Sequence, residues 1–525
     1  MARRINPWII AAVVVIPTFM EVLDTTIANV ALRYIAGGLS AAVTDSEWVI
    51  TSYLAANAII LPISGWLSAR LGRRNYFLGS IAVFTLASAL CGISTSLTQI
   101  IVFRALQGLA GGGLQPSSQA ILLDGFPPEK QGTAQTLFGV AALLGPIVGP
   151  TLGGWLVVNF DWRWIFYVNI PIGFLAFALN WFVTEDPDYL KQARAELRRQ
   201  PLNFDAIGLG LLVLVMASWE ITLSKGQEWD WLGDPFYRIQ TLVACIAVGF
   251  GLLLFRELRI EHPMLNFRVL RDRNLWTCCV IIFCVYAILY AVSFSLPNLL
   301  QTLFTYDALA AGLVMSPSGM TAVTGMLIVG VLLGRGADAR WLIPIGLVIV
   351  ATGNYSMSLM NLDITPWQAT WPRMVLAAGM SCIFAPLNVA AFKYTSPRLR
   401  GAAVGMLALL RNEGGSVGTS MAQTIQERRE QLHTLRVNEF LDPLNPAVRQ
   451  WLHNAHQYFM QQTGDAVASS QMAAQALANT RDAQASSLAY FDVFWVCAVL
   501  PLALILLVFV MKPSAAEKGA HVGAE

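Results

Sequence analysis

Long apolar runs separated by short polar segments fill most of this 525-residue chain. A helix needs about 20 mostly apolar residues to cross the roughly 30 Å hydrocarbon core of a bilayer. We identify fourteen runs of this kind. They lie near residues 8–32, 47–68, 76–95, 98–122, 133–158, 163–183, 205–223, 239–257, 276–300, 308–333, 341–360, 371–392, 401–425 and 490–511. The pattern predicts an all-α polytopic membrane protein with 14 transmembrane helices.

Two longer polar stretches interrupt this pattern. Residues 184–204 are rich in charge and predict a cytoplasmic linker after the sixth run. Residues 426–489 are rich in Gln, Ala and Asn and predict a long outer segment before the last run. Within that segment, apolar and aromatic residues of 447–460 recur at helical spacing. Two interpretations stay open for it: a solvated helical hairpin, or a docking surface for a partner outside the membrane.

Composition agrees with a membrane protein and excludes other classes. Hydrophobic residues make up 56% of the chain and charged residues only 13%, against about 25% charged in ordinary globular proteins. These values exclude a soluble enzyme, a disordered chain and a secreted disulfide scaffold. The net charge of +2 gives no basic surface for nucleic acid. All seven cysteines lie in apolar runs, and we predict no disulfide framework, no metal site and no cofactor.

The distribution of lysine and arginine predicts the orientation. With the N-terminus inside, most basic residues of the connecting segments fall on the cytoplasmic side, and the short outer loops hold only Arg33, Arg163, Lys225 and Arg238. An even number of spans returns the C-terminus to the cytoplasm. The first run is too long for a signal peptide, and we interpret it as a retained span.

Three segments carry motifs. The second run ends in GWLSARLGRRNYF, a glycine followed by a tight basic turn, which alone indicates no more than a positive-inside loop. Its marked residues are Gly65, Arg70, Gly72, Arg73 and Arg74. The fourth run carries Arg104, Gln107 and Gly108 in RALQGLAGGG. A guanidinium at membrane depth costs several kcal/mol unless it is paired or hydrated, so we expect Arg104 to face a cavity or a partner.

The fifth run, GVAALLGPIVGPTLGGW, repeats Gly-Pro pairs. Glycines four residues apart share one helix face and permit close approach of another helix, and the prolines bend the helix. A generic packing motif is the alternative interpretation. The residues concerned are Gly145, Pro146, Gly149, Pro150, Gly153 and Gly154.

These segments together resemble the major facilitator superfamily, and within it the fourteen-span drug:proton antiporters of the EmrB/QacA type, above all the EmrB branch. Residues 65–77 resemble the loop motif, 104–112 the arginine motif and 139–154 the antiporter motif of that family. LDTTIANVAL (Leu23–Leu32) resembles its first-span signature. The chain departs from the family at two positions. Ala69 replaces an acid of the loop motif, so the inner-side latch is expected to be weaker or built differently, and Arg33 stands where proline is common.

The resemblance implies a major facilitator fold, with two six-helix bundles and two inserted helices that rock about a site near mid-membrane. The implied divisions are an N-terminal bundle (1–184), a linker (185–204), two inserted helices (205–258), a second linker (259–275) and a C-terminal bundle (276–525) that includes the outer segment 426–489.

Few acids lie inside the runs, and a proton antiporter needs such groups. Glu21 and Asp24 are three apart on one helix face, Glu220 lies near the end of the seventh run, and Glu413 lies in the thirteenth. We predict proton coupling by Asp24, Glu21 and Glu413 with Arg104, which can pair with either Asp24 or Glu21. A purely structural hydrogen-bonding role stays open for each acid, as does coupled titration of Glu21 with Asp24.

Other residues are candidates for the substrate cavity. They are Asn29, Asn57, Tyr286, Tyr290, Arg411 and Asn412. Arg411 and Glu413 are two apart in the chain, so they cannot share a helix face. We expect one of them, preferably Glu413, to face the cavity.

The predicted function is proton-coupled export of hydrophobic drugs or toxic compounds from the bacterial inner membrane. The alternatives are an exporter of an endogenous metabolite or siderophore and, more remotely, a membrane-embedded transferase. The resemblance also implies partners: a periplasmic membrane-fusion adaptor of the EmrA type and an outer-membrane channel of the TolC type, forming a tripartite pump.

Overall fold

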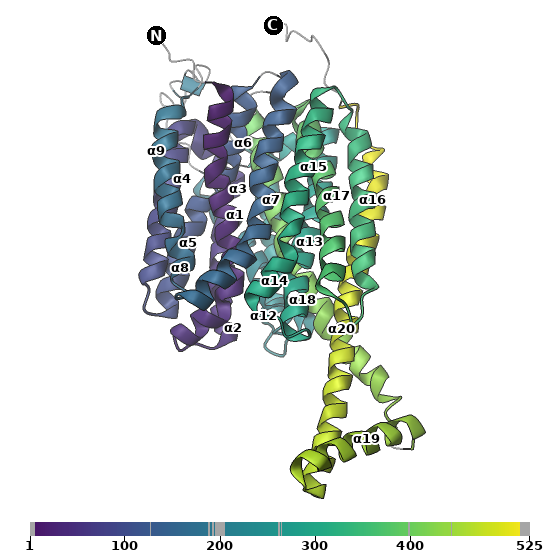
Figure 1. Ribbon diagram of the computed structural model, residues 1–525. Coiled ribbons are helices and arrows are strands. Elements are labelled where there is room, and N and C mark those ends of the chain that lie inside the picture. Colours follow the sequence, from purple (N-terminus) through teal and green to yellow (C-terminus); the bar gives the residue numbers. More distant parts are fainter. Residues whose placement is uncertain are drawn as a thin grey trace.

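The computed structural model describes residues 6–126, 128–186, 190–191, 194, 205–260, 263, 265–396, 399–442 and 444–514. Within these residues every regular element is a helix, and the helices form a bundle with a projection at one end (Figure 1). The predicted all-α class is confirmed. The predicted linker lies mostly outside the described residues.

The helices of the N-terminal half follow the first six predicted spans. They are α1 (Pro7–Gly38), α2 (Val43–Ser46), α3 (Trp48–Leu71), α4 (Arg73–Ile93), α5 (Leu97–Gly111), α6 (Leu114–Gly125), α7 (Pro128–Asn159), α8 (Trp164–Tyr167) and α9 (Asn169–Val183). The side chain of Asn6 accepts a hydrogen bond from the Trp8 amide (3.0 Å), and Pro7 occupies the first turn, which together fix the start of α1. In the bundle α1 packs against α7, α9 and α6, and α5 packs between α3 and α4.

Two long helices follow between the halves. The elements of this part are α11 (Ala206–Lys225), the short 3-10 helix η1 (Trp231–Gly233) and α12 (Arg238–Arg259). Asp205 caps α11 by accepting a hydrogen bond from the Gly208 amide (2.8 Å). Helix α11 packs against both α3 and α18, whereas α12 packs chiefly against α11. Large apolar side chains of α12, such as Phe250 and Phe255, are exposed on the surface of the protein and are positioned to meet lipid.

The C-terminal half holds the largest apolar core. Its elements are η2 (Phe267–Arg271), α13 (Arg273–Thr302), α14 (Ala308–Met315), α15 (Pro317–Gly334), α16 (Ala339–Ser358), α17 (Pro366–Phe392), α18 (Arg400–Asn438), α19 (Pro446–Thr463) and α20 (Ala466–Val508). Helix α13 packs against α18, α20 and α17, and α16 packs between α17 and α20. Leucine, isoleucine, alanine and phenylalanine side chains of these helices make one continuous buried cluster.

Twelve helices in the described part of the chain are long and apolar enough to cross a membrane. The two remaining predicted spans are present as helix but differ in character. Span 98–122 is broken at Gly112 and Gly113 into α5 and α6. Span 401–425 forms the first part of α18. Charged and polar residues interrupt its apolar sequence. Both spans pack against other helices of the bundle.

A projection extends from the bundle at the end opposite the start of α1 (Figure 1). Helix α18 has 39 residues and α20 has 43. At about 1.5 Å per residue, both exceed the roughly 30 Å of a bilayer core. Helix α19 joins their outer ends and packs against α20. The helix predicted for 447–460 is therefore present as α19, between the outer ends of α18 and α20.

The two halves touch closely on the side where α1 begins. A Cβ atom added to Gly65 of α3 would lie 2.9 Å from the backbone of Gly401 in α18, so only glycine permits this approach. Nearby, the amide of Gln119 in α6 donates to the side chain of Asn388 in α17 (2.7 Å). These contacts close the bundle at one end and leave cavities toward the other.

Candidate functional site

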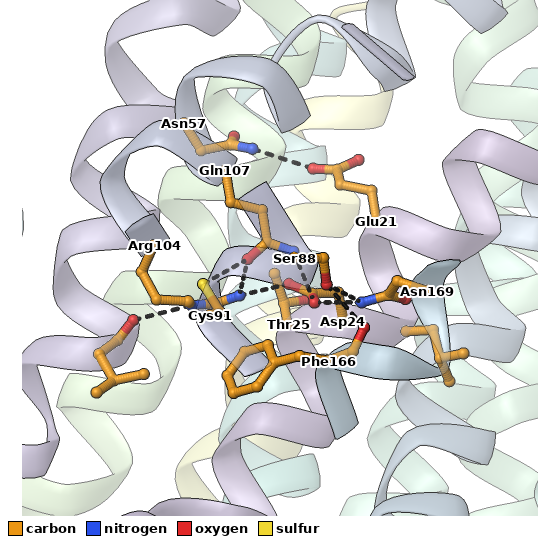
Figure 2. Close-up of polar contacts among 12 residues, drawn as sticks. Glu21, Asp24, Thr25, Asn57, Ser88, Cys91, Arg104, Gln107, Phe166 and Asn169 are labelled. Carbon is orange, nitrogen blue, oxygen red and sulfur yellow. Dashed lines mark hydrogen bonds and ion pairs between the residues drawn. The ribbon is translucent and has the colours of Figure 1, made fainter. Parts of the chain in front are cut away.

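Asp24 lies at the centre of a buried polar cluster in the N-terminal half (Figure 2). Its side chain projects from α1, and the residue is 2% exposed. One carboxylate oxygen accepts from Arg104 Nη1 (2.6 Å). The other accepts from Gln107 Nε2 (2.9 Å) and Asn169 Nδ2 (2.6 Å). A carboxylate with three donors has the partners expected of an ionised acid.

Arg104 is buried and held on several sides. Besides Asp24, it donates to Gln107 Oε1 (2.9 Å) and to the Val49 carbonyl (3.1 Å). Its guanidinium lies 4.3 Å from the ring centroid of Tyr53. Of the two acids considered from the sequence, Arg104 thus pairs with Asp24 and not with Glu21. The ion pair neutralises both charges where neither meets water.

Asn169 was missed by the sequence reasoning. It opens α9, donates to Asp24, and also donates to Ser88 Oγ (3.1 Å), which in turn donates to the Phe166 carbonyl (2.9 Å). The available sequence feature was an asparagine within an apolar run. Its partner lies 145 positions away in the chain, so no local pattern could have named it.

Glu21 belongs to a different environment, although it lies one helical turn from Asp24. In Figure 2 its side chain points toward Asn57 and away from the Asp24 cluster. Asn57 Nδ2 donates to one oxygen (3.1 Å), and the other oxygen has no hydrogen-bond partner in the described part of the chain. The two acids therefore occupy separate hydrogen-bond networks.

A cavity of about 160 Å³ lies between the halves and adjoins this cluster. Side chains of α1, α3, α5, α6, α11, α13 and α18 line it. Among the predicted residues it is lined by Glu21, Asn29, Arg104, Tyr290 and Asn412. Leucine, isoleucine, valine and phenylalanine side chains supply its apolar wall. The combination of apolar wall and few polar groups is typical of small-molecule sites.

Two further cavities adjoin the central one. A small cavity of about 20 Å³ is lined by Asn57, Tyr286 and Arg411, among others. An outer cavity of about 830 Å³ shares Asn29 and Tyr290 with the central one. The outer cavity lies toward the end of α1, opposite the closed contacts between the halves.

Arg411 and Glu413 point in different directions, as their spacing requires. Arg411 contacts Gln115 of α6, and its guanidinium lies 5.5 Å from the ring centroid of Phe138. Glu413 is not among the residues that line these three cavities, and its role in proton coupling stays a prediction. Glu413 interacts with Glu220 of α11, which itself lines the central cavity.

The glycines of α7 face α1. A Cβ atom on Gly145 or Gly149 would collide with Val22 or Thr26, and one on Gly153 would touch Ile27. Thr26 Oγ1 donates to the Gly145 carbonyl across this contact (3.1 Å). The motif thus brings the helix that carries Asp24 against α7. Among its other residues, Gly154 is buried, and Pro146 and Pro150 line the outer cavity.

The loop motif forms the junction between α3 and α4. Gly72 has φ +90°, which favours glycine, and it ends α3 and begins α4. Arg73 forms an ion pair with Asp124 at the end of α6, and Asp124 also lies 3.6 Å from Arg400 of α18. Asp124 therefore joins the two halves in a chain whose loop motif has Ala69 in place of the usual acid.

The remaining motif residues have structural surroundings. The guanidinium of Arg70 lies 5.9 Å from the ring centroid of Trp66. The amide of Arg74 donates to Asp186 (2.8 Å) and its side chain donates to the Trp181 carbonyl (2.8 Å). A Cβ atom on Gly108 would collide with the backbone of α3, so this glycine permits α5 to approach that helix.

Comparison with known proteins agrees with this architecture. The sequence model of the Major Facilitator Superfamily matches residues 14–419. The chain belongs to this superfamily. This superfamily member is 34% identical over 511 residues to the multidrug export protein EmrB of Escherichia coli (strain K12), covering 97% of this chain and 96% of EmrB. It is also 33% identical over 432 residues to the fatty acid resistance protein FarB of Neisseria gonorrhoeae, covering 82% and 83% of the two chains.

A solved structure shows the same fold. The superfamily's proton:xylose symporter XylE, bound to 6-bromo-6-deoxy-D-glucose, superposes with a TM-score of 0.61 over 96% of this chain and 95% of XylE, at 13% identity. The predicted major facilitator fold is confirmed. Membership of this superfamily identifies a membrane transporter and not an enzyme.

The Asp24–Arg104 pair generates a testable prediction for stability. Arg104→Gln leaves a buried carboxylate without its cation, and we expect the free energy of unfolding to fall by about 3–5 kcal/mol. Because Asp24→Asn removes that lone charge, the double variant should be more stable than Arg104→Gln alone. Thermal unfolding of the purified protein in detergent measures the stability of the two single variants and the double variant.

The matched control is the exposed pair of Arg428 and Asp230 (2.8 Å). The corresponding two single variants and double variant of this pair should change stability by less than about 1 kcal/mol, since an exposed pair is solvated. Equal effects of the buried and exposed cycles would contradict the role given to the buried pair.

Proposed function

We propose that this chain is a proton-coupled antiporter that exports hydrophobic drugs or other toxic compounds across the bacterial inner membrane. The observation that carries the proposal is the buried Asp24–Arg104 cluster beside an apolar cavity that also holds Glu21. The names of the relatives support the cargo class, since EmrB is a multidrug export protein and FarB a fatty acid resistance protein.

The proposed exchange depends on how buried acids are satisfied. Glu21 has one donor and an oxygen without a partner, so it can take up a proton or a polar group of the cargo. Asp24 has its full set of donors in this conformation, and it can take a proton once movement of the helices separates it from Arg104. Cargo binds when the acids are charged, and protonation from the outside displaces it.

Alternating access supplies the movement in this proposal. The moving parts are the N-terminal bundle 1–184 and the C-terminal bundle 276–525, with 205–258 between them and 185–204 and 259–275 as linkers. Contacts at Gly65 and Gly401 close one end in the described conformation. The outer cavity then provides the route by which protons reach Glu21 through the shared lining residues Asn29 and Tyr290.

We also propose the orientation and partners. Helix α1 begins and α20 ends on the same side of the bundle, which supports placing both termini in the cytoplasm (Figure 1). The projection of α18, α19 and α20 then extends into the periplasm. Exposed Trp451 and Tyr458 on α19 make it a suitable contact for a membrane-fusion adaptor of the EmrA type, which connects to an outer-membrane channel of the TolC type.

Replacing the central acid tests the transport mechanism. Asp24→Asn keeps the size of the side chain but cannot exchange a proton, so resistance to a panel of hydrophobic toxic compounds should fall about tenfold or more at unchanged protein abundance. The control is Asp161→Asn, which alters an exposed acid that pairs with Arg163 (3.4 Å) and should retain resistance. Full resistance with Asp24→Asn would contradict the proposal.

Metabolite profiles of cells lacking the protein separate drug export from export of an endogenous metabolite or siderophore.

Removal of the projection tests the partner. Deletion of 426–489 should leave transport into inverted inner-membrane vesicles unchanged and abolish efflux across the whole cell envelope, because the pump loses its adaptor contact. A smaller variant, Trp451→Ala with Tyr458→Ala, should weaken the same step without shortening α18 or α20. Efflux that survives the deletion in both assays would place the adaptor contact elsewhere.

A further inference from the structure

The inserted helix α11 forms part of the wall of the central cavity. Glu220, Leu223 and Ser224 of α11 line the cavity beside residues of both halves. Ser224 forms a hydrogen bond with Thr51 of α3 (2.5 Å), and Ser420 of α18 donates to the Leu223 carbonyl (2.7 Å). Helix α11 is therefore bonded to one helix of each half at the place where the halves face one another, and it is no peripheral addition to the bundle.

Two carboxyl groups meet at this junction. Glu220 of α11 is 2% exposed and accepts a hydrogen bond from Ser416 of α18 (3.0 Å). Glu413, also on α18, is 5% exposed and interacts with Glu220. Neither oxygen of Glu413 makes a short hydrogen bond among the described residues, but Trp219 and Asn412 lie close enough to interact with it, as Glu220 does. A buried carboxyl group of α18 therefore lies against a second one, from α11, that reaches the cavity.

The cations of the surrounding helices are engaged elsewhere. On α11, Lys225 pairs with Glu47 (2.9 Å) at the end of the helix. On α18, Arg411 turns to Gln115. The remaining charged and titratable groups around the cavity are Arg104, Glu21 and the phenols of Tyr53 and Tyr290. Of these, Arg104 is paired with Asp24. Within the described residues, no lysine or arginine forms an ion pair with Glu220 or Glu413.

Two neighbouring carboxylates in a water-poor site cannot both be charged without a cation, whereas one proton between them relieves the repulsion. We propose that Glu220 and Glu413 share an exchangeable proton and form a second proton site of the cavity, to which the inserted helix contributes. The pair spans the contact between α11 and α18, so rocking of the C-terminal half alters the separation of the two groups. This movement controls when the proton is held and when it leaves through the cavity.

The inference deepens the proposed proton-coupled transport and rests on it for its role, but the site itself can be tested without any cargo. Infrared spectroscopy of the purified protein in detergent follows the C=O band of protonated carboxyl groups during a pH titration. We expect Glu220→Gln and Glu413→Gln each to displace the titration of the remaining partner. Because the two groups titrate together, the loss of C=O band intensity in the double variant should differ from the sum of the losses in the two single variants.

The matched control is Glu228→Gln, which changes a partly exposed acid just beyond α11 and should leave this band unchanged. Additive losses, or no loss in either single variant, would overturn the inference. Should Glu413→Gln fail to fold, Glu220→Gln carries the test, since Ser416 can donate to a glutamine oxygen as it does to the carboxylate. In that case an unchanged band in Glu220→Gln overturns the inference.

A transport measurement separates this inference from the proposed function. In proteoliposomes with an imposed pH gradient, Glu220→Gln should reduce the response of compound accumulation to the gradient, and Asp24→Asn should abolish it. A coupled infrared signal together with gradient-independent wild-type transport would refute the antiport mechanism and leave the proton site standing. Normal gradient-driven transport without a coupled signal would refute only the proton site.

Discussion

The ion pair between Asp24 and Arg104 is the interaction on which the rest of the site depends. A single charge inside a membrane protein is costly, so each must find a partner, a set of donors or a proton. The chain uses a different solution at each acid. Asp24 has a guanidinium and two amides, Glu21 has one amide and a cavity, and Glu220 and Glu413 have each other. In the proposed mechanism, the acids with incomplete sets of partners can change their charge in this conformation, and Asp24 can do so once it separates from Arg104.

Close helix packing makes this arrangement possible. Glycines of α7 let α1 approach closely enough for Thr26 to reach the Gly145 carbonyl, which holds the helix bearing Asp24 in place. At the closed end, Gly65 allows the two halves to touch, and Asp124 lies between basic residues of both. Small residues thus set the helix positions, and polar residues then join helices that are distant in sequence.

Much of the fold and part of the site could be predicted from the sequence. The apolar runs identified the helices, because bilayer thickness imposes their length, and the cost of a buried guanidinium indicated that Arg104 needs a partner. The choice of Asp24 over Glu21 could not be predicted, because one helical turn separates these acids and the packing of α5 decides between them. Asn169 and Asp124 were missed because their partners come from other helices. The interaction of Glu413 with Glu220 depends on the packing of α11 against α18, which no local pattern reveals.

The central claim is that buried carboxyl groups exchange protons for cargo. The most direct measurement uses wild-type protein in inverted membrane vesicles, where a pH-sensitive dye reports the proton gradient while a panel of hydrophobic compounds is added. The account predicts that transported compounds dissipate the gradient and stop accumulating once an ionophore has removed it. Undiminished accumulation in vesicles without any pH difference would contradict the account.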